Sequence, residues 1–289
     1  FSLNMLLGDA GLMSLSQSAI AGIAAYGVAW LSAMHGYGHL AAVLGATIIS
    51  ILVSAAYGAV ALRVHGIGFL MITLALGQIT WGLAQRWVAV TGGENGITGL
   101  TRPAPFGISI DSADNFFLFT AMVFLAVFCA LHVLSRSCFG VTVRGTRDQS
   151  RRMSALGYNV WLIRWITFTL AGILASIAGV LEAYYSKFAS PNFMSLTEAA
   201  AALLMVIVGG SSALLGPLVG AILVLSLTQI ASSYTEHWVG LLGLLFLLIV
   251  LFMPDGVLPS VSRTMLAFRG RSLVRGSNGK PASIPARTT

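Results

Sequence analysis

The sequence predicts an all-α fold, a polytopic transmembrane helical bundle with eight full helices and a partial helix at the N-terminus. Hydrophobic residues make up 57% of the 289 residues and charged residues only 9%, whereas a soluble domain carries about 25% charged residues. Residues 10–62 and 199–235 contain no formal charge. Alternation with a period of two residues is absent, so neither strands nor a barrel are expected. The composition excludes a soluble enzyme, a disordered protein and a coiled coil.

Interruptions of the apolar runs set the boundaries of the expected helices. The glycine-containing segment HGYGH at 35–39 separates the first two helices, and glycines at 209–210 and the Gly-Pro pair at 216–217 interrupt the last long run. A helix that crosses about 30 Å of hydrocarbon needs roughly 20 residues. We therefore expect a partial helix at 1–7 and full helices near 14–34, 39–62, 66–88, 116–134, 162–182, 195–210, 213–233 and 237–253.

Clusters of basic residues predict which loops lie in the cytoplasm. The segment 135–160 holds five arginines and a single acidic residue, and the tail 254–289 holds six basic residues and a single aspartate. Cytoplasmic loops of membrane proteins are enriched in Lys and Arg. The loop 91–115 carries three acidic residues against one arginine and should lie outside. We expect a transmembrane domain at 1–258 with a cytoplasmic loop at about 135–160, and a basic, disordered cytoplasmic tail at 259–289.

A faint internal repeat suggests two related halves. The segment MSLSQSA at 13–19 is similar to MSLTEAA at 194–200. In the expected topology the first segment enters the membrane from the cytoplasm and the second enters from outside. The halves would then be inverted repeats, as in many transporters. Chance similarity between sequences rich in Ala, Ser and Leu explains the match equally well.

Several kinds of chemistry are excluded by the residues present. The chain has no phosphate-binding loop of the form GxxxxGK[ST], and its two lysines, Lys187 and Lys280, lie in no such motif. It has no Ser/His/Asp, Cys/His or HExxH arrangement, and Cys129 and Cys138 have no metal-ligand spacing. We therefore expect no enzyme activity, no metal and no cofactor on this chain. The basic residues fit the cytoplasmic side of a lipid bilayer and require no nucleic acid.

The basic segment RGTRDQSRRMSALGYN at 144–159 has the pattern of a short amphipathic helix. Its charged residues would face water, Met153 and Leu156 could pack against the bundle, and Gly157 would end the helix at a C-cap. A plain loop that follows the positive-inside rule is the alternative. The length of the segment and its helical pattern favour a helix on the cytoplasmic face that an ATPase subunit could bind.

Four segments of the chain carry a family resemblance. They are LNMLLGDAGLMSLSQ at 3–17 with GIAAY at 22–26, TGGENGITGL at 91–100, the basic segment with Asp148, Ala155, Leu156 and Gly157, and the run from ASP at 189–191 through LMVIVGG at 204–210 to LGPLVGA at 215–221. These segments resemble the permease subunits of bacterial branched-chain amino acid ABC importers of the LivM type. The second is close to the family signature TGGx[DN]G[LI], and the fourth is the most distinctive.

The resemblance implies a subunit of an ATP-driven importer in the bacterial inner membrane. Its partners would be a second permease subunit, two cytoplasmic ATPase subunits that bind ATP and Mg, and a periplasmic solute-binding protein. The implied substrate is leucine, isoleucine, valine or a related small zwitterion or amide, including urea in some relatives. The residues expected to couple the permease to the ATPase are Arg144, Asp148, Arg151, Arg152, Ala155 and Gly157.

The resemblance also implies a substrate pathway and a periplasmic docking loop. The pathway candidates are Gln17, Glu198, Gly209, Gly210, Gly216 and Pro217, where glycines could break helices beside a cavity. For the two polar residues, an N-terminal cap or an interfacial position is the alternative. The periplasmic candidates are Thr91, Gly92, Gly93, Asn95 and Gly96, for which a tight turn is the alternative.

Two other function classes are weighed against the importer. A single-chain secondary transporter would need ionisable residues deep within its helices, whereas Arg86, Arg164, Glu182 and Glu236 lie near predicted helix ends. An integral membrane enzyme would need a cluster of polar residues at one membrane face, and the sequence shows none. The identity of the solute does not follow from the sequence alone.

Overall fold

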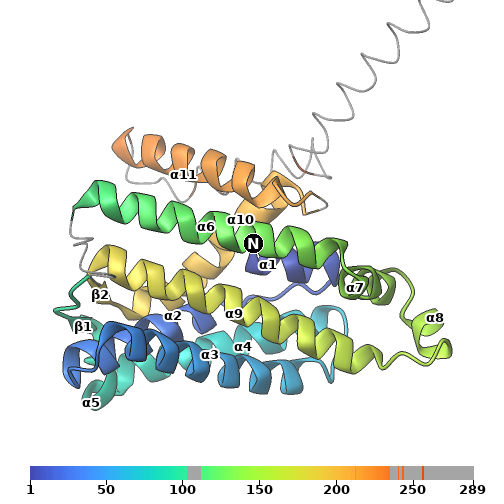
Figure 1. Ribbon diagram of the computed structural model, residues 1–289, viewed down its shortest axis with the longest axis horizontal. Helices are drawn as coiled ribbons and strands as arrows, with labels where there is room; N and C mark the ends of the chain where they lie inside the picture. Colours follow the sequence, from blue (N-terminus) through green and yellow to red (C-terminus); the bar gives the residue numbers. More distant parts are fainter. Residues whose placement is uncertain (103–111, 212, 235–239, 241–242, 244–255, 257–289) are drawn as a thin grey trace, which may run out of the picture.

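The computed structural model describes residues 1–102, 112–211, 213–234, 240, 243 and 256. These residues form mostly helices, as the sequence predicts, and five of the helices are long and apolar enough to cross a membrane. The five are α2 with its continuation η2 (Gln17–Ala29 and Trp30–Met34), α3 (His39–Ala61), α4 (Ile67–Arg86), α6 (Ala113–Arg136) and α9 (Val160–Ser186). They run roughly along the horizontal direction of Figure 1.

Two shorter apolar helices, α10 (Leu196–Gly209) and α11 (Gly216–Tyr234), follow α9. The remaining elements are α1 (Ser2–Asn4), η1 (Met5–Asp9), α5 (Val88–Thr91), η3 (Gly93–Asn95), β1 (Ile97–Thr98), α7 (Cys138–Asp148), α8 (Ser150–Ala155), β2 (Phe188–Ala189) and η5 (Pro191–Met194). The predicted helix at 237–253, apart from residues 240 and 243, and the predicted tail at 259–289 lie outside the described residues. The prediction of a helical protein with several membrane-spanning helices is confirmed, and the predicted helices at 195–210 and 213–233 are present as the shorter α10 and α11, but the count of eight full helices is not confirmed.

Helix α2 lies at the centre of the bundle and contacts α3, α4, α9 and α10. Small residues permit the close packing, because Gly179 of α9 lies directly against the backbone of Ala21, and Gly172 lies against Ser54 of α3. Close approach at small residues is a common way for helices to associate within membranes. Helix α6 lies at the edge of the described bundle, and of its side chains only Phe116 and Leu131 are buried.

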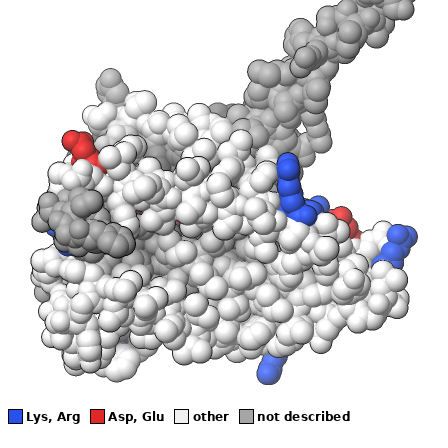
Figure 2. All heavy atoms as spheres, viewed as in Figure 1, with Lys and Arg blue, Asp and Glu red and all other residues white. Residues whose placement is uncertain are grey.

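The two ends of the bundle differ in composition. One end, here called the basic end, carries the α3–α4 turn with Arg63 and the segment 136–159 that includes α7 and α8. The other end, here called the ribbon end, carries the α2–α3 turn, α5 and the strands β1 and β2 (Figure 1). In Figure 2, Lys and Arg side chains stand out at the right, where α7 and α8 lie, and a mostly uncharged surface separates this end from the ribbon end. The predicted alternation of loops between two sides is therefore present in the structure.

A short antiparallel ribbon corrects the expectation that the chain forms no strands. Ile97 pairs with Ala189 and Thr98 pairs with Phe188. Each strand has only two residues, too few to produce an alternating pattern in the sequence. Gly96 makes the pairing possible, since its φ of 67° suits glycine and a Cβ there would overlap the carbonyl oxygen of Ala189.

Helix α2 begins inside the bundle, at Gln17, and not at residue 14 as predicted. The preceding segment, here called the re-entrant segment (residues 10–16), is apolar but not helical, so hydropathy alone did not reveal the break. The Oγ of Ser2 lies 2.9 Å from Oε1 of Gln17 and 2.6 Å from the carbonyl oxygen of Ala171. Ala171 follows the start of α9 by 11 residues, so α2 begins about 16 Å in from the basic end.

Helix α10 begins inside the bundle from the opposite end. After β2, the turn η5 brings Met194 over Gly22 of α2, next to Ala21, which packs on Gly179 of α9. Gly179 precedes the end of α9 by seven residues, so α10 begins about 10 Å in from the ribbon end. The two copies of the suspected repeat, 13–19 and 194–200, thus each lead into a helix that starts at depth from opposite ends. An inverted repeat has this geometry.

Candidate functional site

A cavity of about 370 Å³ lies between α1, α2, α6, α9, α10 and α11. Two of the predicted pathway residues, Gln17 and Pro217, line it. Most of the wall is apolar and is formed by side chains such as Leu174, Ile177 and Val206. No side chain among the described lining residues carries a charge. The cavity therefore lies between the start of α2 and the outer helices of the bundle.

Three polar side chains in this cavity have hydrogen-bonding atoms without a partner among the described residues. They belong to Gln17, Ser18 and Thr120, and the Gln17 side chain is almost fully enclosed, with 4% of the residue exposed. The Nε2 of Gln17 is the atom without a partner, and its Oε1 competes with the Ala171 carbonyl oxygen for the single hydroxyl proton of Ser2. An apolar pocket with a few neutral polar groups suits a small solute that has one apolar and one polar end.

The other predicted pathway residues lie elsewhere. Glu198 is exposed in the first turn of α10, and its backbone N–H donates to the Oγ of Ser195 over 3.3 Å, so this segment forms an N-cap. Gly209 and Gly216 lie where α10 and α11 cross, because a Cβ at Gly209 would overlap the Gly216 carbonyl oxygen. Gly210 follows α10 with a φ of 97°. None of these residues lines the described cavity that Gln17 lines, so a pathway role for them stays a prediction.

At the basic end, α7 is an additional helix that the sequence reading did not separate from the loop. Two of its arginines face the bundle. Arg144 pairs with Asp9 of η1 at 3.3 Å, and the Nη1 of Arg147 donates to the carbonyl oxygen of Gly8. Arg147 also pairs with Asp148 at 2.9 Å, and Asp148 ends α7, so it is not part of the predicted short helix. The basic segment is therefore two helices with different surroundings.

Helix α8 projects outward from α7 (Figure 1), and its Arg151, Arg152 and Ala155 are exposed. Its end agrees with the prediction. Gly157 has a φ of 87°, its N–H donates to Ser154 over 3.0 Å, and the N–H of Tyr158 donates to Met153 over 3.1 Å. This pair of bonds is a Schellman C-cap. Of the two apolar residues expected to pack, Met153 lies against Gly145, whereas Leu156 is 73% exposed.

The motif at 91–96 forms a compact turn at the ribbon end. The hydroxyl of Thr91 lies 2.6 Å from the Ala84 carbonyl oxygen and 2.8 Å from that of Trp87. The three glycines of the motif, Gly92, Gly93 and Gly96, all have positive φ. Asn95 and its neighbour Glu94 are exposed at the tip. The structure thus explains the glycines as parts of a turn that supports β1, and a docking role for the exposed tip stays a prediction.

Sequence reasoning missed several residues of the site. Ser18 and Thr120 are hydroxyls within apolar helices, where no pattern marks them. Asp9 lies 135 positions before its partner Arg144, so nothing local indicated the pair. The Nη2 of Arg164 donates to the Thr146 carbonyl oxygen over 3.1 Å, which ties α9 to α7.

Comparison with known proteins identifies similar transport permeases. The model of a family described as the permease component of branched-chain amino acid transport systems matches residues 1–252. The chain is 27% identical to the high-affinity branched-chain amino acid transport system permease protein LivM of Salmonella typhimurium, over 89% of the chain and 66% of that protein. The same identity and coverage hold for LivM of Escherichia coli K12. The chain is 25% identical to LivH of Escherichia coli K12, over 48% of the chain and 44% of that protein.

The chain spans 66% of the length of the two LivM relatives, so part of those proteins has no counterpart in it. No solved structure matches the chain.

Proposed function

We propose, from the premise that this chain belongs to the family of permease components of branched-chain amino acid transport systems, that it is the membrane-spanning subunit of an ATP-driven importer. The observation that carries the proposal is the uncharged cavity at the buried start of α2, whose wall also includes Ala202, Met205 and Val206 of α10. A solute held there lies beside two helices that begin inside the bundle from opposite ends. Transporters use such interrupted helices around a binding site at depth.

The walls of the cavity support a substrate class. Apolar residues from α6 and α9 would contact a branched aliphatic side chain, and the free polar atoms of Gln17, Ser18 and Thr120 would bond to the polar end of the solute. A solute with a net charge would lose its hydration without gaining a charged partner among the lining residues. The cavity therefore favours branched-chain amino acids or related small polar solutes without net charge.

The energy would come from partner chains. The sequence carries no phosphate-binding loop, whereas α8 offers two exposed arginines, Arg151 and Arg152, on a helix that stands away from the bundle. We infer that α8 docks against two cytoplasmic ATPase subunits, which bind ATP and Mg. The basic end would then face the cytoplasm of a bacterium, in agreement with the positive-inside rule.

Two further partners complete the proposed importer. The similarity to both LivM and LivH supports a second permease subunit that pairs with this chain in the inner membrane. A periplasmic solute-binding protein would deliver the substrate to the ribbon end, where Glu94 and Asn95 are exposed on the turn beside β1. The relatives are transport permeases. Among the described residues, no three side chains of His, Cys, Asp or Glu lie close enough together to hold a metal ion.

Uptake in reconstituted vesicles tests the proposed function. The full chain, its partner permease, the ATPase subunits and the binding protein are assembled in vesicles, and uptake of labelled leucine is measured with and without ATP. We expect uptake only with ATP. Uptake of leucine by this chain alone, driven by an ion gradient, would contradict the proposal and favour a secondary transporter. Competition by unlabelled isoleucine, valine and urea ranks the solutes.

Gln17→Leu should weaken substrate binding in the cavity. The substitution removes the free polar atom of the amide while it keeps a similar volume, and one hydrogen bond to a charged group contributes about 1.5 to 3 kcal/mol. We expect the KM for leucine uptake to rise roughly tenfold or more. Gln78→Leu is the matched control, because Gln78 lies on α4 and lines none of the described cavities. An equal rise in both variants would show that Gln17 does not contact the solute.

A further inference from the structure

Two arginines on one face of α7 hold the start of the chain. Arg144 and Arg147 are three positions apart, and both reach η1. The first makes an ion pair with Asp9 at 3.3 Å, and its side chain and that of Asp9 are only 37% and 26% exposed. The second donates to the carbonyl oxygen of Gly8. We call Arg144, Arg147, Gly8 and Asp9 the α7 clamp.

The stem of Arg147 adds a third contact to the clamp. It lies over Gly11, where the backbone has a φ of 66° and an added Cβ would be 2.6 Å from the Cγ of Arg147. A side chain at Gly11 would therefore both strain the backbone and displace the arginine. The clamp thus holds η1 and also the first residues of the re-entrant segment.

The clamped segment leads directly to the cavity. Seven residues separate Asp9 from Gln17, and the re-entrant segment that they form is fixed on its far side by a bond of 3.3 Å from the Leu15 N–H to Thr73 of α4. Ser2 is the first residue of α1, which η1 continues, and its Oγ lies 2.9 Å from Oε1 of the Gln17 amide. A shift of η1 would therefore move the Gln17 amide, which we propose to bond to the polar end of the solute.

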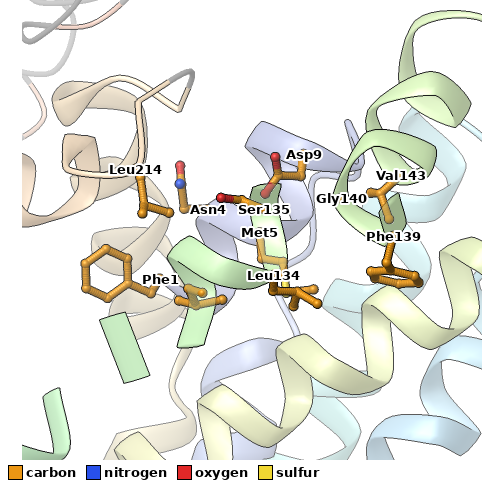
Figure 3. A pocket seen from close by; sticks show the side chains of 11 residues that line it. Phe1, Asn4, Met5, Asp9, Leu134, Ser135, Phe139, Gly140, Val143 and Leu214 are labelled. Carbon is orange, nitrogen blue, oxygen red and sulfur yellow. The ribbon is translucent and has the colours of Figure 1, made fainter. Parts of the chain in front are cut away.

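The joint between η1 and α7 is incompletely packed. A cavity of about 20 Å³, room for about one water molecule, lies between η1, the end of α6 and α7. Figure 3 shows Asp9, Met5 and Asn4 on one side of it and Val143 and Phe139 of α7 on the other. The Oδ1 of Asn4 is buried without a partner among the described residues. Polar contacts therefore contribute to the connection between the two elements, beside the buried side chains of Met5 and Val143.

We propose that the α7 clamp transmits movement of the cytoplasmic helices α7 and α8 to the re-entrant segment and so to Gln17 in the cavity. The proposal rests on the proposed function and adds a route within this chain, in which Arg144 and Arg147 are positioning residues that touch no substrate. Because α8 follows α7 after a single residue, Gln149, a pull on α8 reaches α7 first. The clamp then carries the movement to a segment more than 130 positions earlier in the sequence.

Exchange of the two charges of the ion pair tests the clamp. Asp9→Arg and Arg144→Asp each place like charges together, whereas the double variant restores an opposite pair. In the reconstituted importer we expect each single variant to reduce ATP-driven leucine uptake about tenfold or more, and the double variant to recover to within about twofold of wild type. In Asp9→Arg, which changes no residue expected to contact the ATPase, ATPase assembly and basal ATP hydrolysis should not change. Arg136→Asp, at an exposed position of the same end, is the control for charge alone.

A second readout does not depend on the transported solute. In a background with Cys129→Ser and Cys138→Ser, Ser18→Cys reports access to the cavity through its rate of labelling by a small thiol reagent. We expect a non-hydrolysable ATP analogue to change this rate in the complex without clamp substitutions. The analogue should not change the rate when Asp9→Arg is present, and it should change the rate again in the charge-exchanged pair. If the wild-type complex takes up no leucine, the proposed substrate is wrong and the labelling still decides the clamp.

Three results would overturn the clamp. The first is wild-type uptake and wild-type labelling in both single variants. The second is a charge-exchanged pair that takes up leucine no faster than the single variants, or a loss of ATPase assembly in the single variants. Either result would show a contact that is needed only for folding. The third is a labelling rate in the wild-type complex that does not respond to the ATP analogue.

Discussion

Gly179→Leu is expected to prevent assembly of the folded bundle. A Cβ at this position would overlap the carbonyl oxygen of Ala21 and lie 2.9 Å from its Cα, so the obstacle is the backbone of α2 and no side chain can rotate away. Overpacking of a tight core costs about 1 to 3 kcal/mol, and the displacement of a central helix should exceed the upper value. We expect little or no monodisperse protein in detergent, measured by size-exclusion chromatography after membrane extraction.

Gly82→Leu is the matched control for this substitution. Gly82 lies within α4, and a Cβ there would meet nothing within 4 Å. The same change of residue type in another membrane-spanning helix should leave the yield and the thermal unfolding midpoint close to wild type. Equal losses in both variants would show that the effect comes from glycine itself and not from the contact between α2 and α9.

Arg151→Glu together with Arg152→Glu is expected to abolish binding of the ATPase subunits. Both side chains are exposed on α8, and neither belongs to the clamp. Reversal of two charges at an interface replaces attraction by repulsion, and charge pairs at interfaces contribute about 1.5 to 7 kcal/mol each. We expect the affinity, measured with the full permease in lipid nanodiscs, to fall about a hundredfold or more.

Arg63→Glu together with Arg136→Glu controls for net charge, because both residues are exposed at the same end and lie outside α8. ATPase binding should stay within about threefold of wild type in this variant. If the α8 variant binds the ATPase normally, α8 is not the docking element, and the proposed energy source needs another contact surface.

The fold was largely predictable where hydropathy alone decides structure. Helices α3, α6 and α9 lie in charge-free or nearly charge-free runs, and their predicted ranges differ from the structure by only a few residues. The start of α2 was missed because residues 10–16 are as apolar as the helix that follows, and contacts to α4 and α7 keep them irregular. Helix α7 was missed because Arg144, Arg147 and Asp148 were assigned to a polar loop, although the buried residues Gly140, Val143 and Thr146 recur every three positions.

The site was predictable in part. Gln17 and Pro217 were selected by their places in a resemblance, and the structure brings both to one cavity. Ser18 and Thr120 gave no signal, because a hydroxyl in a membrane helix usually bonds to its own backbone. The partners in the α7 clamp lie so far apart in the sequence that only the folded chain joins them.

The central place of α2 has a consequence for biosynthesis. It has the lowest mean hydropathy of the five long helices, 1.2, and half of it is buried by the rest of the protein. Its main neighbour, α9, begins 143 residues later, which corresponds to about 7 to 30 s of translation at the rates of cellular synthesis. During this interval α2 can pack on α3 but lacks the helix that packs against Ala21. Packing of the amino-terminal half is therefore completed only after the second half of the chain has been made.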